Sequence, residues 1–192
     1  MNSLILVVSN GYHVEHSLIT AFMITVHAVA KFEGIFYGAC ASLNVWRLVV
    51  YDRDFSLAQI WLSAVTAYKN QNWWLQLLDE VIGYCPSSIF SYLASSAAKI
   101  DVGEEVYSSE STSHHTKTQM GSGQFVNEGF GKACYIRNIG YMDNSGKFKD
   151  VKAHSLNLFA TRPFCYNVEI SDIMHASPLL AEISVMLVKG AG

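Results

Sequence analysis

The chain has 192 residues, a formal net charge of −3, and 51% hydrophobic against 15% charged residues. This length is enough for one domain with a buried core. The negative net charge gives no electrostatic basis for binding nucleic acid. No uncharged apolar run reaches the roughly 18 residues expected of a membrane span. The sequence therefore predicts neither nucleic acid nor a membrane as a partner.

Residues 1–26 are expected to form an irregular N-terminus. A largely apolar run from Leu18 to Ala30 ends in Ala-Val-Ala, a small-residue pattern that resembles a signal-peptide cleavage site. No basic residue precedes this run, and two histidines and a glutamate stand where a positively charged segment belongs. The run is therefore not a convincing signal peptide.

Strands are predicted through most of the first half of the chain. The apolar stretch from Ile24 to Trp46 indicates two strands joined by a polar corner at residues 31–34. Residues 55–65 alternate in a way that predicts another strand, with Leu57, Gln59 and Trp61 on one side. Residues 73–78 are apolar on both faces, which is typical of a strand inside a β-sandwich.

One helix is predicted, over residues 86–100. Pro86 suits the first turn of a helix. Ile89, Leu93 and Ala97 then fall on one apolar stripe.

The second half of the chain again reads as strands. They are expected at residues 106–107, 116–125, 134–141, 153–160 and 164–170. The apolar tail at 178–188 shows no clear face and is either a last strand or sequence outside the fold. The predicted fold class is mostly β, an antiparallel β-sandwich with one short helix.

Two polar motifs are weak candidates for chemistry. His114 and His115 are adjacent, so on a strand they would point to opposite faces and could not chelate a metal together. Ser122 lies in a Gly-Ser-Gly sequence, which lacks the Gly-x-Ser-x-Gly spacing and the following helix of a nucleophile elbow. A solvated loop and a turn are the better interpretations.

The chain also contains four widely spaced cysteines, Cys40, Cys85, Cys134 and Cys165. None forms a Cys-x-x-Cys pair, so no zinc site is expected. Nothing local pairs any of these thiols with a histidine as a nucleophile. Their spacing leaves disulfides and buried free thiols equally open.

A carboxylate pair, Glu104 and Glu105, follows Gly103. Its glycine and apolar neighbours suit a functional side chain that projects into a cleft, although a lone strand glutamate more often faces water. Trp73 and Trp74 are ambiguous in the same way, because either could belong to the core or line a cleft.

A longer pattern favours a functional interpretation. It comprises Tyr37-Gly38-Ala39, Leu43-Asn44-Val45-Trp46, residues 55–62, Asn72-Trp73-Trp74-Leu75, residues 81–86, Gly103-Glu104-Glu105-Val106, residues 118–123, residues 129–133 and Cys165-Tyr166. With these segments the chain resembles the neprosin family, plant proteins with a domain of the glutamic peptidase type. The resemblance covers most of residues 27–168. It implies a partial neprosin-type domain at 27–170 and a divergent tail at 171–192.

The resemblance also implies a chemistry. Family members are secreted β-sandwich proteins, and the best-known kind is an acid-active endopeptidase that cuts beside proline with two glutamates. One ionised carboxylate takes a proton from water, and the other, protonated, donates to the substrate. Such a site takes a peptide and requires no metal or organic cofactor. Glu105 matches the second glutamate, and Trp73, Trp74 and Gln119 become candidates for the substrate cleft.

Three departures from the family pattern lower the expected activity. Glu104 occupies a glycine position, and the Ile-Glu-Ala-Gly-Trp motif of the first glutamate is absent between residues 62 and 72. Glu104 cannot stand in for that glutamate, because neighbours on a strand leave opposite faces. After residue 171 the chain leaves the pattern, as a truncated gene product would.

Two functions follow as expectations. The first is a catalytically impaired member of the glutamic peptidase class. The alternative is a non-catalytic extracellular β-sandwich that binds a peptide or a cell-wall polysaccharide. The sequence leaves the oligomeric state open.

Overall fold

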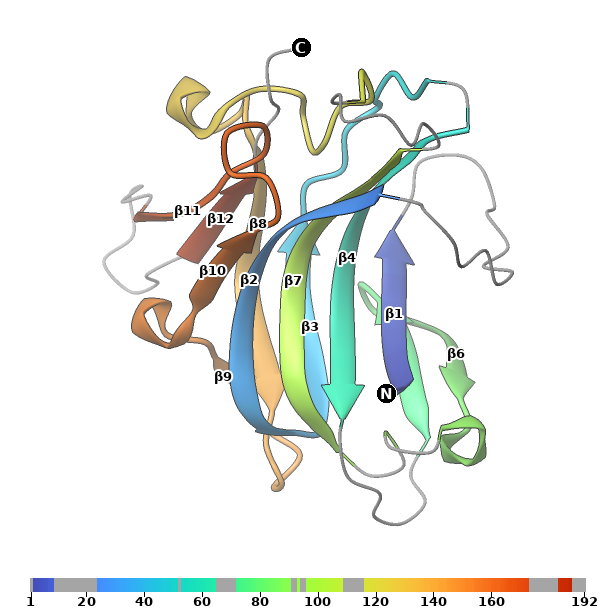
Figure 1. Ribbon diagram of the computed structural model, residues 1–192. Coiled ribbons are helices and arrows are strands. Elements are labelled where there is room, and N and C mark those ends of the chain that lie inside the picture. Colours follow the sequence, from blue (N-terminus) through green and yellow to red (C-terminus); the bar gives the residue numbers. More distant parts are fainter. Residues whose placement is uncertain are drawn as a thin grey trace.

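The computed structural model describes residues 2–8, 24–51, 53–64, 72–90, 93, 96–108, 116–172 and 183–187. Within them the chain forms two antiparallel sheets and a separate two-stranded hairpin (Figure 1). The mostly β fold and its antiparallel pairing are thus confirmed.

The first sheet, called the β7 sheet after its central strand, has five strands. In spatial order they are β1 (Asn2–Val8), β4 (Phe55–Ala64), β7 (Ala97–Ser108), β2 (Ile24–Phe36) and β10 (Asn157–Ala160). Because β7 pairs with β4 on one side and β2 on the other, its side chains have neighbours on both flanks.

The second sheet, the β8 sheet, is also antiparallel. It contains β11 (Val168–Asp172), β12 (Ile183–Leu187), β8 (Cys134–Met142) and β3 (Gly38–Leu43), with β9 (Phe148–Asp150) paired to β8. The hairpin consists of β5 (Trp73–Leu77) and β6 (Glu80–Cys85). Three 3-10 turns complete the described elements, Ser87–Ile89, Val126–Glu128 and Ala153–Ser155.

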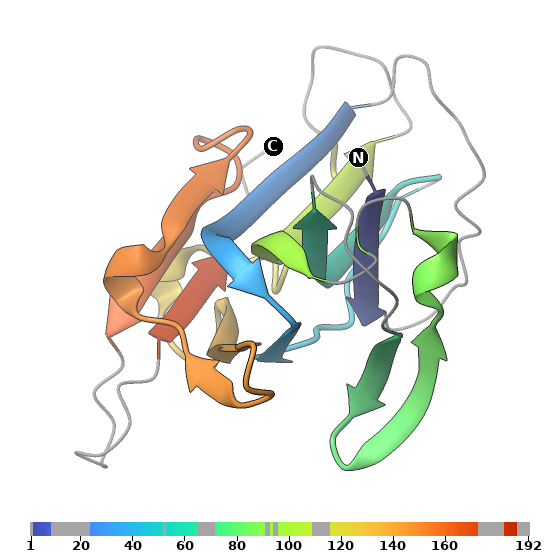
Figure 2. The ribbon, with the colours of Figure 1, turned by 90° about the horizontal axis from the view of Figure 1, so that it is seen from below.

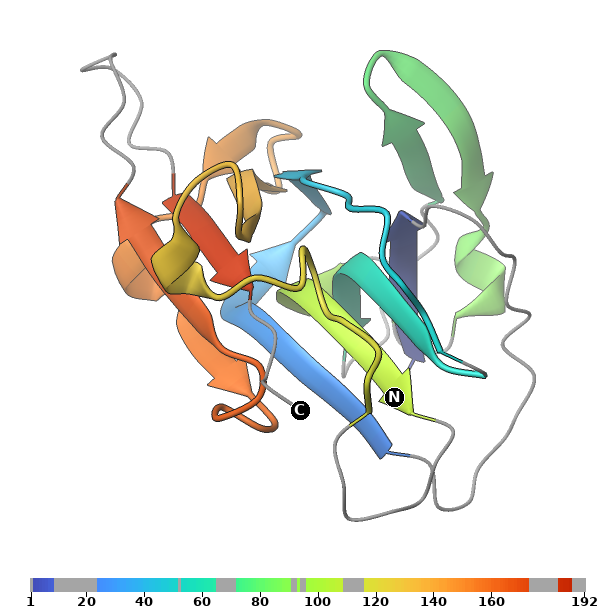
Figure 3. The ribbon, with the colours of Figure 1, turned by 90° about the horizontal axis from the view of Figure 1, so that it is seen from above.

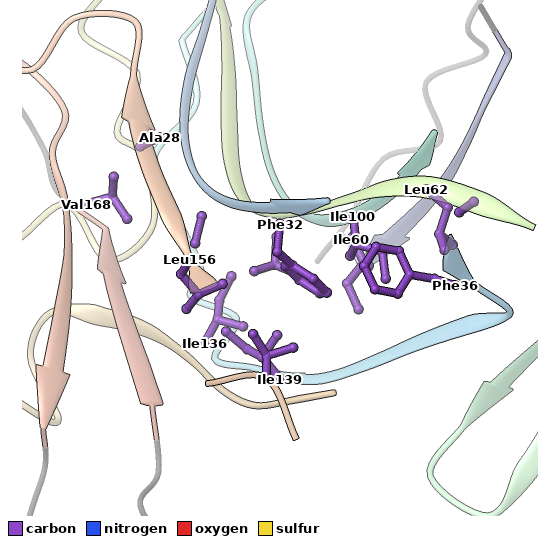
Figure 4. Close-up of a cluster of buried hydrophobic side chains, with 14 of the residues drawn as sticks. Ala28, Phe32, Phe36, Ile60, Leu62, Ile100, Ile136, Ile139, Leu156 and Val168 are labelled. Carbon is purple, nitrogen blue, oxygen red and sulfur yellow. The ribbon is translucent and has the colours of Figure 1, made fainter. Parts of the chain in front are cut away.

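The core lies between the two sheets. Ile100, Val102 and Val106 of β7 are fully buried and belong to one apolar cluster with Ile136 and Ile139 of β8. Figure 4 shows side chains from both sheets meeting in this layer. Since successive strand residues point to opposite faces, the odd-numbered residues from Lys99 to Tyr107 lie on the face away from the core, whereas Ala97, beyond the register shift with β2, belongs to the core cluster.

β2 is longer than the sequence indicated. Residues 31–34 were expected to form a corner, but they lie inside the strand, and the chain turns at Tyr37 instead. Phe32 and Phe36 are both buried and pack edge to face at 5.2 Å between ring centroids. This burial keeps the strand in the sheet through its polar stretch, with a register shift between Glu33 and Phe36.

The helix predicted over 86–100 is wrong. Among the described residues of this range, Ser87–Ile89 form a 3-10 turn, and residues from Ala97 onward belong to β7. Leu93 is fully buried, and its carbonyl accepts a hydrogen bond from Trp73 Nε1 at 2.5 Å. Tertiary packing of this segment therefore outweighs its helical periodicity.

The strand predicted at 116–125 is also wrong. These residues form a turn-rich loop in which Gly121 and Gly123 have φ angles of 60° and 72°, values that glycine adopts readily. Met120 in the middle of the loop is fully buried in the core cluster.

The two ends of the described chain contain strands. Residues 2–8 form β1, where an irregular start was expected, and pair with β4. The tail contains β12, which lies between β11 and β8. Residues 9–23, which include the start of the signal-like run, and His114 and His115 lie outside the described residues.

The β5–β6 hairpin stands beside the sandwich, as the views in Figure 2 and Figure 3 show. The strand expected at 73–78 exists, but it does not lie inside the sandwich with both faces covered. Trp73 is 8% exposed whereas Trp74 is 66% exposed. The hairpin therefore turns one side toward the core and leaves the other open.

Candidate functional site on the outer face of the β7 sheet

Glu105 lies on the face of the β7 sheet that points away from the core. Its half-buried carboxylate accepts a hydrogen bond from Gln59 Nε2 of β4, with a distance of 3.0 Å to Oε2. Gln59 is only 1% exposed, and its Oε1 atom is buried with no hydrogen-bond partner among the described residues. The buried amide of Gln59 therefore orients the Glu105 carboxylate through its Nε2 atom. Its Oε1 atom is a second polar atom beside that carboxylate.

His27 of β2 is the direct cross-strand neighbour of Glu105. Directly paired residues of an antiparallel sheet share a face, with Cβ atoms about 4.5–5.5 Å apart. The imidazole also packs edge to face against Trp61 of β4, with 6.1 Å between ring centroids. Side chains from the two strands that flank β7 thus meet above it.

Gly103 has no side chain and so leaves space on β7 in which the side chains of His27 and Trp61 meet. It pairs with Val29 on β2 and Gln59 on β4, one row along from Glu105. A Cβ atom at this position would collide with the Ala28 carbonyl oxygen and lie 2.6 Å from Val29 Cγ1. The absence of a side chain therefore lets β2 approach β7 closely and leaves the middle of the face uncovered by β7 itself.

Asp101 adds a second carboxylate on the same face. It pairs with Lys31 on β2 and Trp61 on β4, and its Oδ2 atom lies 2.7 Å from Lys99 Nζ. We call His27, Gln59, Trp61, Asp101 and Glu105 the outer-face cluster.

The charge state of His27 depends on its surroundings in this cluster. Burial lowers the pKa of His27, and the positive charge of Lys31 lowers it further, while Asp101 acts in the opposite direction. At neutral pH the imidazole is therefore uncharged.

Glu104 lies on the opposite face, inside the sandwich. It is 2% exposed, and burial raises its pKa to about 8, so the carboxyl is largely protonated at neutral pH. Cys134 Sγ lies 3.3 Å from Glu104 Oε1, and the Gly121 backbone also hydrogen-bonds to the carboxyl. Its cross-strand neighbours, Ala28 and Ala58, are both small and leave room for it. The prediction that the two glutamates point to opposite faces is confirmed.

The structure separates the other residues that the sequence proposed for a substrate cleft. Trp73 belongs to the core cluster. Trp74 projects from the hairpin and packs against Tyr84. The side chain of Gln119 lies against Gly123, in the loop after β7. Trp73, Trp74 and Gln119 therefore lie in three different parts of the structure. None of them belongs to the outer-face cluster around Glu105.

Sequence reasoning missed most of the outer-face cluster. The alternation of residues 55–65 did place Gln59 and Trp61 on one side of a strand, but nothing aligned that side with Glu105. His27 gave no signal at all, because it stands alone in an apolar run. Long-range pairing of β2 and β4 with β7 creates the cluster.

The loop motif at residues 118–123 has a structural role. Thr118 is 1% exposed, donates a hydrogen bond to Asp54 Oδ2 at 2.8 Å and accepts one from the Tyr51 backbone at 3.1 Å. Ser122 Oγ accepts a hydrogen bond from the Gln124 backbone at 3.2 Å, within its own turn. The motif ties this loop to residues 51–54.

The described part of the chain contains no group of three or more histidine, cysteine or acidic residues that could hold a metal ion. All four cysteines are free thiols, with Cys134 buried and Cys40 exposed. No helix in the described ranges is long and apolar enough to cross a membrane.

The fold is that of an antiparallel β-sandwich protein, and the outer-face cluster is a candidate site with carboxylates on one sheet. A comparison with known families gives the more specific assignment. Residues 56–178 match the Neprosin family, a span that covers more than half of the chain and includes Gln59, Trp61 and Glu105. The chain belongs to the Neprosin family.

Proposed function

We propose that the outer-face cluster is a peptide site of the glutamic peptidase type in which hydrolysis is impaired. The hydrogen bond between Gln59 and Glu105 carries this proposal, because it holds one carboxylate in a fixed, half-buried position on a sheet face. A carboxylate in such a position can accept a hydrogen bond from a peptide N–H group, and it can take a proton from a water molecule that attacks the peptide carbonyl.

The impairment has a chemical reason. Amide hydrolysis needs a base for the attacking water and an acid for the leaving amine, and two carboxyl groups divide these roles when their pKa values differ. Gln59 can donate a hydrogen bond, but an amide does not exchange protons in this pH range. Loss of a positioned acid or base lowers the rate by about 10²–10⁴-fold. We therefore propose binding of peptides with little turnover, in the extracellular setting that the family resemblance implies.

A peptide assay tests this function. Purified protein is incubated at acidic pH with a proline-containing peptide, using one molecule of protein per hundred of peptide, and binding is measured by calorimetry. We expect binding that weakens in Glu105→Gln and persists in Glu80→Gln, a change at an exposed glutamate of the hairpin. Many turnovers within an hour, lost in Glu105→Gln, would overturn the impairment. Binding that is equal in all three proteins would overturn the site itself.

A second candidate function rests on the hairpin. Trp74 and Tyr84 are both more than half exposed, and their ring centroids lie 5.0 Å apart. Such a pair offers a stacking surface for sugar rings or for a peptide. This surface supports the alternative of a non-catalytic binding protein for peptides or cell-wall polysaccharides. Ligand binding that is lost in Trp74→Ala and unaffected by Glu105→Gln would favour it.

A further inference from the structure

We propose that His27 is the proton-exchanging partner of Glu105 on the outer face of the β7 sheet. This inference rests on the proposed function, because it assigns a second catalytic residue to the same site. In this proposal, the slow hydrolysis that the site retains uses the Glu105 carboxylate and the His27 imidazole as its acid–base pair.

Backbone pairing places the two side chains together. His27 and Glu105 are direct partners in the β2–β7 register, so both project from the outer face on adjacent strands. On its other side, β2 is held by β10. The His27 N–H donates to Thr161 Oγ1 at 3.1 Å, and the Thr161 N–H donates to the His27 carbonyl at 2.9 Å. These contacts fix the backbone from which the imidazole projects.

The surroundings of the pair suit different roles for its two members. Gln59 of β4 donates a hydrogen bond to the Glu105 carboxylate, and His27 is the residue of β2 that pairs directly with Glu105. The edge-to-face contact with Trp61 restricts the imidazole. Among the described residues, the charges that act on the pKa of His27 are those of Lys31 and Asp101, and Asp101 is itself paired with Lys99 at 2.7 Å. Phe159 and Thr161, on the β10 side, do not titrate.

The pair can complete a hydrolytic cycle. Ionised Glu105 takes a proton from water as the water oxygen forms a bond with the peptide carbonyl carbon. Protonated His27 gives its proton to the amide nitrogen as the carbon–nitrogen bond breaks, which releases an amine and a carboxylic acid. Glu105 then returns its proton to His27, so that one water is consumed and both residues regain their starting states.

This assignment predicts a narrow working range. The productive state requires Glu105 ionised and His27 protonated. A carboxylate ordinarily ionises near pH 4.3, and burial lowers the pKa of His27 from its ordinary value of 6.5. The slow cleavage is therefore expected to decline above the pKa of His27 and below the pKa of Glu105, with a bell-shaped dependence on pH.

The first test follows the imidazole itself. The pKa of His27 is measured from the pH dependence of the NMR signal of its ring protons. That signal is identified as the one that is missing from the spectrum of the His27→Gln variant. An ionised neighbour stabilises the imidazolium, so Glu105→Gln is expected to lower the pKa of His27 by about 0.5–1 unit. Glu80→Gln should leave it unchanged. Identical values in the wild type and Glu105→Gln would overturn the pairing.

The second test follows cleavage at equal concentrations of protein and a proline-containing peptide over several days. We expect slow cleavage with a maximum in mildly acidic solution, reduced at least tenfold in His27→Gln and in Glu105→Gln. Cleavage that persists in His27→Gln with the same pH profile, or its absence from the wild type, would overturn the catalytic role. Peptide binding that depends on Glu105 but not on His27 would leave the proposed function intact and reject this inference alone.

Discussion

Cys134 and Glu104 meet inside the β-sandwich, where the thiol donates a hydrogen bond to the Glu104 Oε1 atom at 3.3 Å. Cys134 comes from β8 and Glu104 from β7, so this contact joins the two sheets. Burial and the adjacent carboxyl both raise the pKa of the Cys134 thiol, which therefore stays protonated and able to donate. A neutral acid and a neutral thiol can share this apolar layer, whereas a buried charge there would be costly.

The free energy of unfolding should consequently fall as pH rises through the range in which Glu104 is protonated in the folded state but ionised in the unfolded state. Its pKa is about 8 in the folded protein against an ordinary value of 4.5. Between these values the folded state holds a proton that the unfolded state has lost, so each pH unit lowers the free energy of unfolding by about 1.4 kcal/mol. The decline should level off above pH 8.

Urea unfolding at pH 5, 6, 7 and 8 checks this dependence. Glu104→Gln removes the titration and keeps a hydrogen-bond acceptor, so its stability should change much less over the same range. Glu80→Gln, at an exposed position, should decline like the wild type. Parallel curves for the wild type and Glu104→Gln would show that the buried carboxyl does not control the effect.

Trp73 and Trp74 should respond oppositely to truncation, although they are adjacent. Trp73→Ala opens a cavity in the core and removes the hydrogen bond to the Leu93 carbonyl, so a loss of about 3–5 kcal/mol is expected. Trp74→Ala removes an exposed ring and should cost less than about 1 kcal/mol. Urea unfolding followed by circular dichroism measures both values, and equal losses would contradict the orientation of β5.

Gly103→Ala should destabilise the β7 sheet strongly. The new Cβ atom would press on the backbone of β2, and the cost of such overpacking is expected to reach about 3 kcal/mol. Gly83→Ala is the matched control, because Gly83 also lies in a strand but a methyl group there would have no atom within 4 Å. That change should stay within about 1 kcal/mol of the wild type. Similar thermal midpoints for the two variants would argue against the close approach of β2 and β7.

Thr118→Val should weaken the link between the loop after β7 and residues 51–54. The change keeps the shape of the side chain but leaves the Tyr51 N–H without its acceptor and removes a donor to Asp54. A loss of about 1–3 kcal/mol in the free energy of unfolding is expected. Thr118→Ser keeps the hydroxyl and should lose less, and the reverse order would contradict a hydrogen-bonding role.

The sequence predicted the parts of this protein that depend on local alternation. The strand at 55–65 is present as β4, because a period of two in polarity is also the period of the pleat, and the strand expected at 134–141 is present as β8. The same rule placed Glu104 and Glu105 on opposite faces. Local patterns failed at residues 86–100, where a helical stripe predicted a helix, and at 116–125, where a strand was predicted. The burial of Leu93 and Met120 overrides local preference in these two segments.

By itself, the sequence therefore determined the β class, the family and the opposed directions of the two glutamates. The tertiary structure alone decided what each glutamate faces. It placed Glu105 between Gln59 and His27 on the outer face, and Glu104 against Cys134 in the core. The reason is that the alternation of faces along a strand depends only on neighbouring residues. The register between strands pairs segments tens of residues apart, and it follows from how the whole sheet buries its apolar face.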